Sequence, residues 1–155
     1  MLVMTLDDAG DGLCATVAVP NESDVLRRIS AIEEQHSIGI LWALLTSLMG
    51  MVSNEHEYKM MGMAPYASLK AARDKADIFH GGYRMENGSW RRANGLPAAM
   101  YADNCWRERL EFKRFDVIRG GLQLFTEEFV CNWIRYWLKQ SRLKAVRLSR
   151  RRFRT

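Results

Sequence analysis

A long amphipathic segment near the carboxyl end places the strongest limit on the fold. Between Asp116 and Lys139, apolar side chains recur at steps of three and four residues, which is the period of an α-helix. The residues on this face are Ile118, Leu122, Phe125, Phe129 and Trp133, and the face is widened by Val130, Ile134, Trp137 and Leu138. A face of this width is expected for a helix packed against a sheet. Gly120 and Gly121 each cost about 1 kcal/mol relative to alanine in a helix. They therefore predict either a close helix contact or a helix that begins nearer Leu122.

Short strand-like runs supply the expected sheet. Leu2–Leu6 and Leu13–Val19 are separated by the turn cluster Asp7–Gly12, which predicts a hairpin with an acidic, glycine-bearing tip. The run Val25–Glu34 fits a strand or a helix equally well. Near the carboxyl end, Ala145–Leu148 predicts the start of another strand.

Between these strands the pattern predicts helices and a second hairpin. Ser37 suits the N-cap of an apolar helix that ends at Gly50. Two shorter helices are expected over His56–Met61 and Ser68–Ala76, and Asn87-Gly88 is a preferred turn for a two-residue hairpin. The stretch 91–104 is weakly patterned and is expected to be a loop. The mixture of elements predicts an α/β fold.

Chain length and composition indicate an ordinary soluble domain. The 155 residues suffice for one domain with a core of its own. The longest apolar stretch, Ile38–Val52, is too short and too polar to span a bilayer. The amino terminus lacks a basic region followed by an apolar one. A cytoplasmic location without a membrane partner is therefore expected. Cys14, Cys105 and Cys131 are far apart, which favours reduced thiols over a zinc site or disulfides.

The net charge of +5 raises the question of nucleic acid. Much of it lies near the carboxyl end, at Arg142, Lys144, Arg147, Arg150, Arg151, Arg152 and Arg154. Such a run can bind phosphates non-specifically. No aromatic–basic alternation, helix-turn-helix or zinc pattern accompanies it. We expect no specific nucleic-acid partner, although a small basic nucleic-acid-binding protein stays open as an alternative.

Two constellations carry residues suited to chemistry. In the acidic hairpin tip, a carboxylate can lie near a metal ion while the backbone N–H groups of glycines face phosphate oxygens. An Asp/Gly turn is also a common way to join two strands. The second constellation is His36–Trp42 together with Asn54–Tyr66, in which Glu57 and Lys59 flank Tyr58. Lys59 could meet a phosphate or carbamoyl oxygen, and Glu57 could orient it or accept a proton. A solvated surface pair is the alternative.

Together these segments resemble the antibiotic- and nodulation-type O-carbamoyltransferases. That family carries a strand and turn of the form L-T-L-D-G-x-G-D, followed by H-S-L-G-L-L-Y and G-E-Y-K-x-M-G-L-A-P-Y-G. The matching segments here are Leu2–Gly12 and His36–Tyr66. The resemblance implies part of an actin-like, nucleotide-binding domain of the ribonuclease H-like, sugar-kinase and Hsp70 type, related to the threonylcarbamoyl-adenosine synthases.

The resemblance also implies an activity. Family members convert carbamoyl phosphate and ATP into a carbamoyl-adenylate, then pass the carbamoyl group to a hydroxyl of a sugar or antibiotic. They use a divalent metal, commonly iron. Residue by residue, the match implies catalytic roles for Glu57 and Lys59. The positions implied to bind the cofactor are Asp7, Gly10, Asp11, Gly12, His36, Gly62 and Tyr66.

The chain departs from the family pattern at several places. Asp8 stands where the family has glycine, and His56 stands where it has a small residue. The family's paired histidine ligands match positions upstream of Leu2. The three histidines of this chain are not spaced to share one helix face, so we expect no metal ligands here.

The carboxyl end departs further. The family continues its strand into L-S-G-G-V-F-A-N, whereas this chain reads Leu148-Ser-Arg-Arg-Arg-Phe-Arg-Thr155. Codons for the arginine run, read one nucleotide out of register, can spell the family's glycine turn. We therefore interpret 1–149 as a partial N-terminal domain, 150–155 as a frameshifted basic tail, and the C-terminal domain as absent.

Such a chain is expected to be inactive on its own. Alternatively, it is a degenerate chain that acts as an interaction module and docks through its long helix. Trp133 and Trp137 would then lack their natural cover and would favour oligomerisation.

Overall fold

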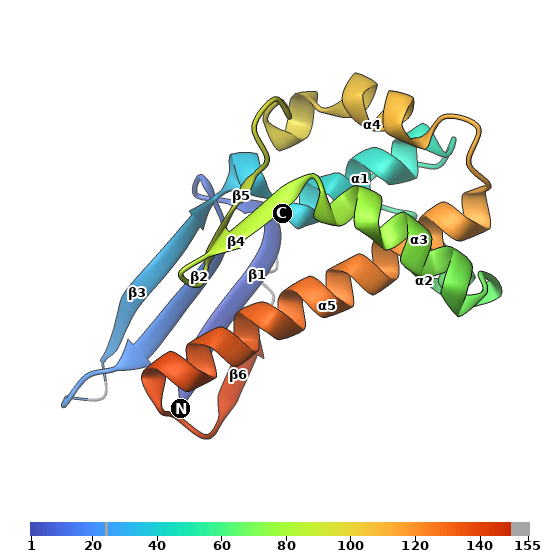
Figure 1. The fold of residues 1–155 in the computed structure, drawn as a ribbon. Coiled ribbons are helices and arrows are strands. Elements are labelled where there is room, and N and C mark those ends of the chain that lie inside the picture. Colours follow the sequence, from blue (N-terminus) through green and yellow to red (C-terminus); the bar gives the residue numbers. More distant parts are fainter. Residues whose placement is uncertain (24, 150–155) are drawn as a thin grey trace.

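The computed structural model describes residues 1–23 and 25–149. The tail 150–155, interpreted above as frameshifted, lies outside the described residues. A four-stranded sheet forms one side of the molecule, in the order β3-β2-β1-β6 (Figure 1). Its strands are β1 (Leu2–Gly10), β2 (Leu13–Pro20), β3 (Leu26–Glu33) and β6 (Val146–Ser149). The first three are antiparallel neighbours, and β6 pairs with β1 in parallel.

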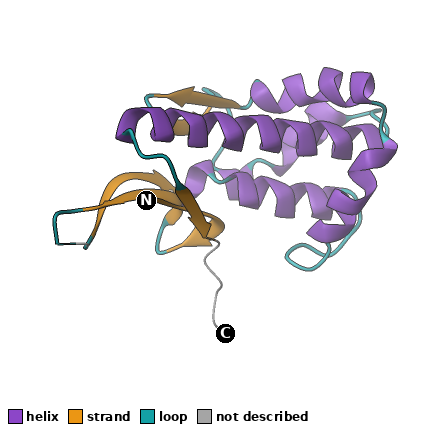
Figure 2. Ribbon diagram, turned by 90° about the horizontal axis from the view of Figure 1, so that it is seen from below, coloured by secondary structure: helices purple, strands orange, loops and turns teal. Residues whose placement is uncertain are grey.

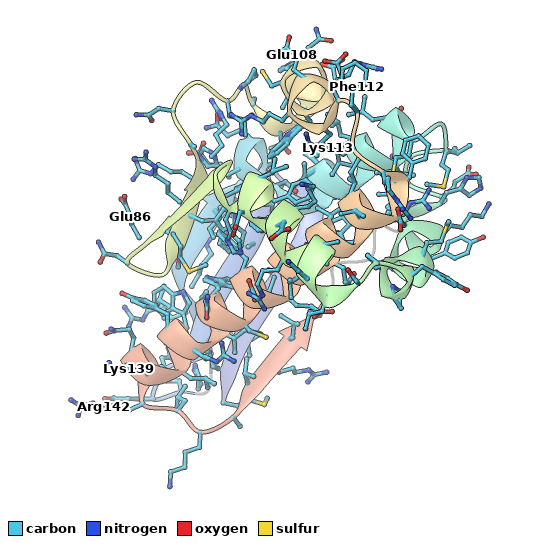
Figure 3. The ribbon with its side chains drawn as sticks, turned by 45° about the vertical axis from the view of Figure 1, so that its right-hand side comes forward. Glu86, Glu108, Phe112, Lys113, Lys139 and Arg142 are labelled. Atoms are coloured by element: carbon cyan, nitrogen blue, oxygen red, sulfur yellow. The ribbon has the colours of Figure 1, made fainter. Side chains whose placement is uncertain are left out.

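The segments between β3 and β6 form the rest of the molecule. They are η1 (Glu34–His36), α1 (Ile38–Leu48), α2 (Glu57–Met63), η2 (Ala64–Tyr66), α3 (Leu69–His80), β4 (Tyr83–Glu86), β5 (Ser89–Arg92), η3 (Ala99–Tyr101), α4 (Asp103–Leu110) and α5 (Phe115–Ser141). The predicted α/β class, both hairpins and the long helix are confirmed. Helix α4 was not predicted: its first two residues fall in the stretch interpreted as a loop, and the rest was given no assignment. At the end of α4, Phe112 adopts a positive φ of 58° and projects from the surface (Figure 3).

The two faces of the sheet differ in character. Met4 and Val17 are paired across β1 and β2, and both are fully buried. The next pair, Thr5 and Thr16, faces the opposite way and is only half-buried. This alternation is expected for a sheet with one face against the core. Figure 2 shows the described helices gathered on one side of the sheet, which leaves its other face open.

Helix α5 is uninterrupted through Gly120 and Gly121, so it does not begin at Leu122. The glycines instead permit a close contact. A β-carbon at Gly120 would lie 2.7 Å from the Ala67 Cβ, and one at Gly121 would lie 2.6 Å from the Lys75 Cβ. Helix α5 therefore packs directly against η2 and α3.

Contrary to the expectation from sequence, Trp133 of α5 is covered, and Trp137 is half-buried. Trp133 is fully buried, and the indole N–H groups of Trp133 and Trp137 both donate to the Gly88 carbonyl. The β4–β5 hairpin supplies their cover, and its turn has the predicted positive φ at Asn87 and Gly88. Phe129 and Trp133 belong to the same core as Leu2 and Met4 of the sheet. No helix in the described part of the chain is long and apolar enough to cross a membrane.

Candidate functional site

The tip of the β1–β2 hairpin is narrower than the sequence predicted. The predicted turn Asp7–Gly12 is wrong in its first part, because β1 continues to Gly10 and only Asp11 and Gly12 form the turn. Between Leu6 and Gly10 the register shifts, so β1 bulges against β2. The Asp7 and Asp8 carboxylates each accept a hydrogen bond from the following backbone N–H, at 2.9 Å. These local bonds let the acidic residues stay within a strand.

A depression of about 650 Å³ lies beside this tip. It is lined by Thr5, Asp7, Gly10, Asp11, Leu13, Cys14, Ala15, Thr16, Arg28 and Ser149. Thr5 pairs with Ser149 where β1 and β6 run parallel, so both strands direct their carboxyl ends to this edge of the sheet. Ligands of open α/β sheets bind at the carboxyl ends of the strands. The depression therefore occupies the favoured position for a ligand in this fold.

The lining offers three kinds of polar group. The Thr5 and Thr16 hydroxyls lie 2.7 Å apart, so one donates to the other and one proton is left for another acceptor. Asp7 and Asp11 contribute carboxylates, and Arg28 on β3 contributes a guanidinium. Arg28 is exposed, so water and small solutes can reach it. A guanidinium and hydroxyls can bind an anion, and the neighbouring carboxylates can bind a divalent cation carried by that anion.

The second family segment begins against this tip. The Glu34 N–H donates to the Gly12 carbonyl at 2.9 Å, which ties η1 to the turn. Ser37 caps α1, and its hydroxyl accepts from the Ile40 N–H at 3.0 Å. One residue into α1, a β-carbon at Gly39 would lie 2.5 Å from the Asp8 Cα. Only glycine therefore allows the start of α1 to approach β1 so closely.

His36 is held at this junction by the second hairpin. Its Nδ1 accepts from the Arg92 backbone N–H at 3.3 Å, and its carbonyl accepts from the Trp90 indole at 3.0 Å. Burial, followed by the positive charge of Arg92, holds the pKa of His36 below its ordinary value. The imidazole is therefore neutral near pH 7, and its Nδ1 is engaged in positioning the β4–β5 hairpin.

The remaining predicted site residues lie together on α2 and η2. The Glu57 Oε1 accepts from the Asn54 N–H at 2.6 Å and closes the preceding turn. The Lys59 ammonium lies 5.7 Å from the centre of the Tyr58 ring. A β-carbon at Gly62 would meet nothing within 4 Å, and Tyr66 is 79% exposed. This group is on the surface.

The structure thus divides the predicted site into two groups. Asp7, Gly10 and Asp11 line the depression, and Gly12 completes the same turn. The Gly12 carbonyl accepts from Glu34, two residues before His36. Helix α1 runs from this tip towards α2, and its 11 residues span about 16 Å at 1.5 Å each (Figure 1). No residue of α2 or η2 lines the depression.

The family assignment follows from comparison with known proteins. The family model described as the carbamoyltransferase N-terminus matches residues 1–141. The chain belongs to the carbamoyltransferase family. Over 89 residues, or 54% of the chain, it is 32% identical to the nodulation protein NolNO of Sinorhizobium fredii. The chain spans 13% of the length of that protein. The family resemblance inferred from the sequence motifs is confirmed.

Several residues that line the depression were not predicted from sequence. Thr5, Thr16 and Arg28 come from three different strands, and only the register places them together. Cys14 also lines the depression, and burial raises the pKa of its thiol to about 12. The alternation of side chains along a strand would have placed Thr5 and Thr16 on the same face of the sheet. It could not have shown that these two residues lie opposite each other.

The iron implied by the family resemblance does not fit the residues in view. Within 1–23 and 25–149, no three His, Cys, Asp or Glu side chains lie close enough together to hold a metal ion. We therefore derive no chemical step through iron.

Proposed function

We propose that the depression at the β1–β2 tip binds the phosphate groups of Mg·ATP. The chain would then be part of an actin-like nucleotide-binding domain, in an enzyme that uses carbamoyl phosphate and ATP to carbamoylate a hydroxyl group. The observation that carries this proposal is the position of the depression. It lies at the carboxyl ends of the parallel strands β1 and β6, beside a glycine-bearing turn.

The side chains of the depression suit such a ligand. Magnesium binds through one or two carboxylates together with the oxygens of substrate phosphates, rather than in a cage built only by protein. Asp7 and Asp11 provide two carboxylates on the hairpin tip. Arg28 can pair directly with a phosphate oxygen, and the Thr5–Thr16 pair can donate one further hydrogen bond. The positive amino-terminal end of α1 also abuts β1 at Asp8.

The roles proposed for the second group are separate from this step. Lys59 and Glu57 lie on α2, outside the depression. Their proposed action on a carbamoyl or phosphate oxygen requires a ligand that reaches α2. His36 is proposed to frame the cleft through the junction it makes with Arg92.

Calorimetric titration of Mg·ATP into the purified chain tests the proposal. We expect Arg28→Ala to weaken Mg·ATP binding by about tenfold or more, because a hydrogen bond to a charged group is lost. Arg84→Ala is the matched control, since it removes the same charge from an exposed position on β4. Equal affinities in Arg28→Ala and the wild-type chain, or no binding by either, would contradict the proposal.

A further inference from the structure

Arg119 is buried in α5, and no carboxylate of residues 1–23 or 25–149 forms an ion pair with it. The residue is only 6% exposed. Its Nη1 donates to the Met63 Sδ at 2.7 Å, and its Nε is buried with no hydrogen-bond partner among the described residues. A thioether sulfur is a weak acceptor. The guanidinium has therefore lost much of its water without gaining a carboxylate from the described part of the chain, which costs folding free energy.

Two apolar side chains next to Arg119, Met63 and Phe115, are exposed. Met63, which covers the guanidinium, is itself 41% exposed. Phe115 precedes Arg119 by one turn of α5 and is 59% exposed. Helix α2 and segment η2 both contact α5. We call the exposed apolar residues of this end the α2–α5 surface. They are Tyr58, Met61, Met63, Tyr66 and Phe115.

Charge and polarity together define what this surface can bind. A buried guanidinium presents a planar fork of donors that matches a carboxylate, and a charge-assisted pair is stronger than a bond to sulfur. Methionine is flexible, so Met63 can move aside to admit that carboxylate. The exposed apolar rim favours a ligand with apolar side chains over a bare inorganic anion.

We propose that the α2–α5 surface docks an apolar protein segment whose aspartate or glutamate pairs with Arg119. The carboxylate would replace Met63 as the partner of the guanidinium, and the apolar side chains beside it would cover the rim. This surface shares no residue with the depression at the β1–β2 tip. The proposal therefore does not rest on nucleotide binding.

The first test concerns the unpaired state of Arg119 in the free chain. Arg119→Met keeps an apolar stem and removes the charge. We expect the urea midpoint of Arg119→Met to equal or exceed that of the wild-type chain, because the substitution leaves no buried carboxylate without a partner. A lowered midpoint would show that Arg119 is already satisfied within the fold and would overturn the proposal.

The second test uses two synthetic amphipathic helical peptides. One carries a single glutamate at the centre of its apolar face, and the other carries glutamine there. We expect the glutamate peptide to bind the wild-type chain about tenfold more tightly or better, and Arg119→Met to abolish the difference. Met61→Ser should weaken both peptides, whereas Leu26→Ser, at an exposed apolar position on β3, should weaken neither.

Three outcomes of the peptide experiment would overturn the proposal. One is the absence of binding by either peptide. Another is equal affinity of both peptides for the wild-type chain. The third is displacement of the glutamate peptide by inorganic phosphate at matched concentration, because that would identify a small-anion site instead of a protein-docking surface.

Discussion

The β1–β2 tip is fixed by specific backbone contacts with later segments, whereas the α2–η2 segment packs on α1 and α5 but leaves most of its residues outside the core. Glu34 binds the Gly12 carbonyl, Gly39 lies against the Asp8 backbone, and His36 is fixed by the second hairpin. In α2 and η2, only Met60 and Ala64 are buried. Both regions carry motifs that resemble the same family pattern.

The two motifs therefore differ in how their residues are positioned. Residues at the tip are positioned by neighbours within the chain, so their geometry is set before any ligand arrives. Most residues on α2 lie outside the core, so the role proposed for their motif requires a ligand that approaches from outside. The two regions should therefore respond differently to matched substitutions.

The largest expected contrast is between two glycines. Gly39→Ala would place a β-carbon 2.5 Å from the Asp8 Cα, against backbone that cannot easily move. We expect a loss of about 1–3 kcal/mol in the free energy of unfolding. Gly62→Ala meets nothing within 4 Å and lies within α2, so we expect a gain of about 0.5–1 kcal/mol from helix propensity. Urea denaturation of both variants measures the contrast, and equal effects would refute it.

A smaller contrast is expected between two helix caps. Ser37 is fully buried and caps α1 beside the tip, with a 3.0 Å bond to the Ile40 N–H. Ser68 is exposed and caps α3 after η2, with a 3.3 Å bond to the Ala71 N–H. We expect Ser37→Ala to cost about 1–2 kcal/mol and Ser68→Ala about 0.5 kcal/mol. Thermal and urea unfolding would test this order, and a larger loss in Ser68→Ala would reverse the account.

The smallest expected effect is a pH dependence from His36. Because the folded-state pKa of His36 lies below its ordinary value of about 6.5, the unfolded chain binds this proton first as pH falls. The free energy of unfolding should therefore decrease as the pH falls from about 6.5 to the folded-state pKa of His36. Well above pH 6.5, His36 should contribute no pH dependence. His36→Asn offers an amide oxygen in place of Nδ1 and should reduce this decrease. The control is His56→Asn on the α2 side. Identical pH profiles for both variants would contradict the role of His36.

Much of the fold was predictable because it depends on local patterns. The long helix, the N-cap at Ser37 and the turn at Asn87-Gly88 each follow from residues close in sequence. Helix α4 escaped prediction because its apolar residues, Trp106 and Leu110, are too few to reveal a period. The strand identity of Val25–Glu34 was settled only by pairing with β2, since its exposed arginines mask the alternation.

The site was less predictable, because it depends on contacts between distant segments. The motifs indicated candidate residues such as Asp7 and Asp11, and the structure then showed that Arg28 and Ser149 line the same depression. The extension of β1 through Asp7 and Asp8 was missed because a bulge lets turn-forming residues stay in a strand. Nothing local to Arg119 revealed that it would be buried without a carboxylate partner among the residues that the structure describes.

Amide chemical-shift mapping with Mg·ATP tests the central claim most directly. The account predicts that amides from Thr5 to Leu13, together with Thr16 and Arg28, shift in a saturable manner as Mg·ATP is added. Amides from Tyr58 to Tyr66 should stay in place. Saturable shifts confined to α2 and η2, or no saturable shifts at the β1–β2 tip, would contradict the assignment of the depression as the nucleotide-phosphate site.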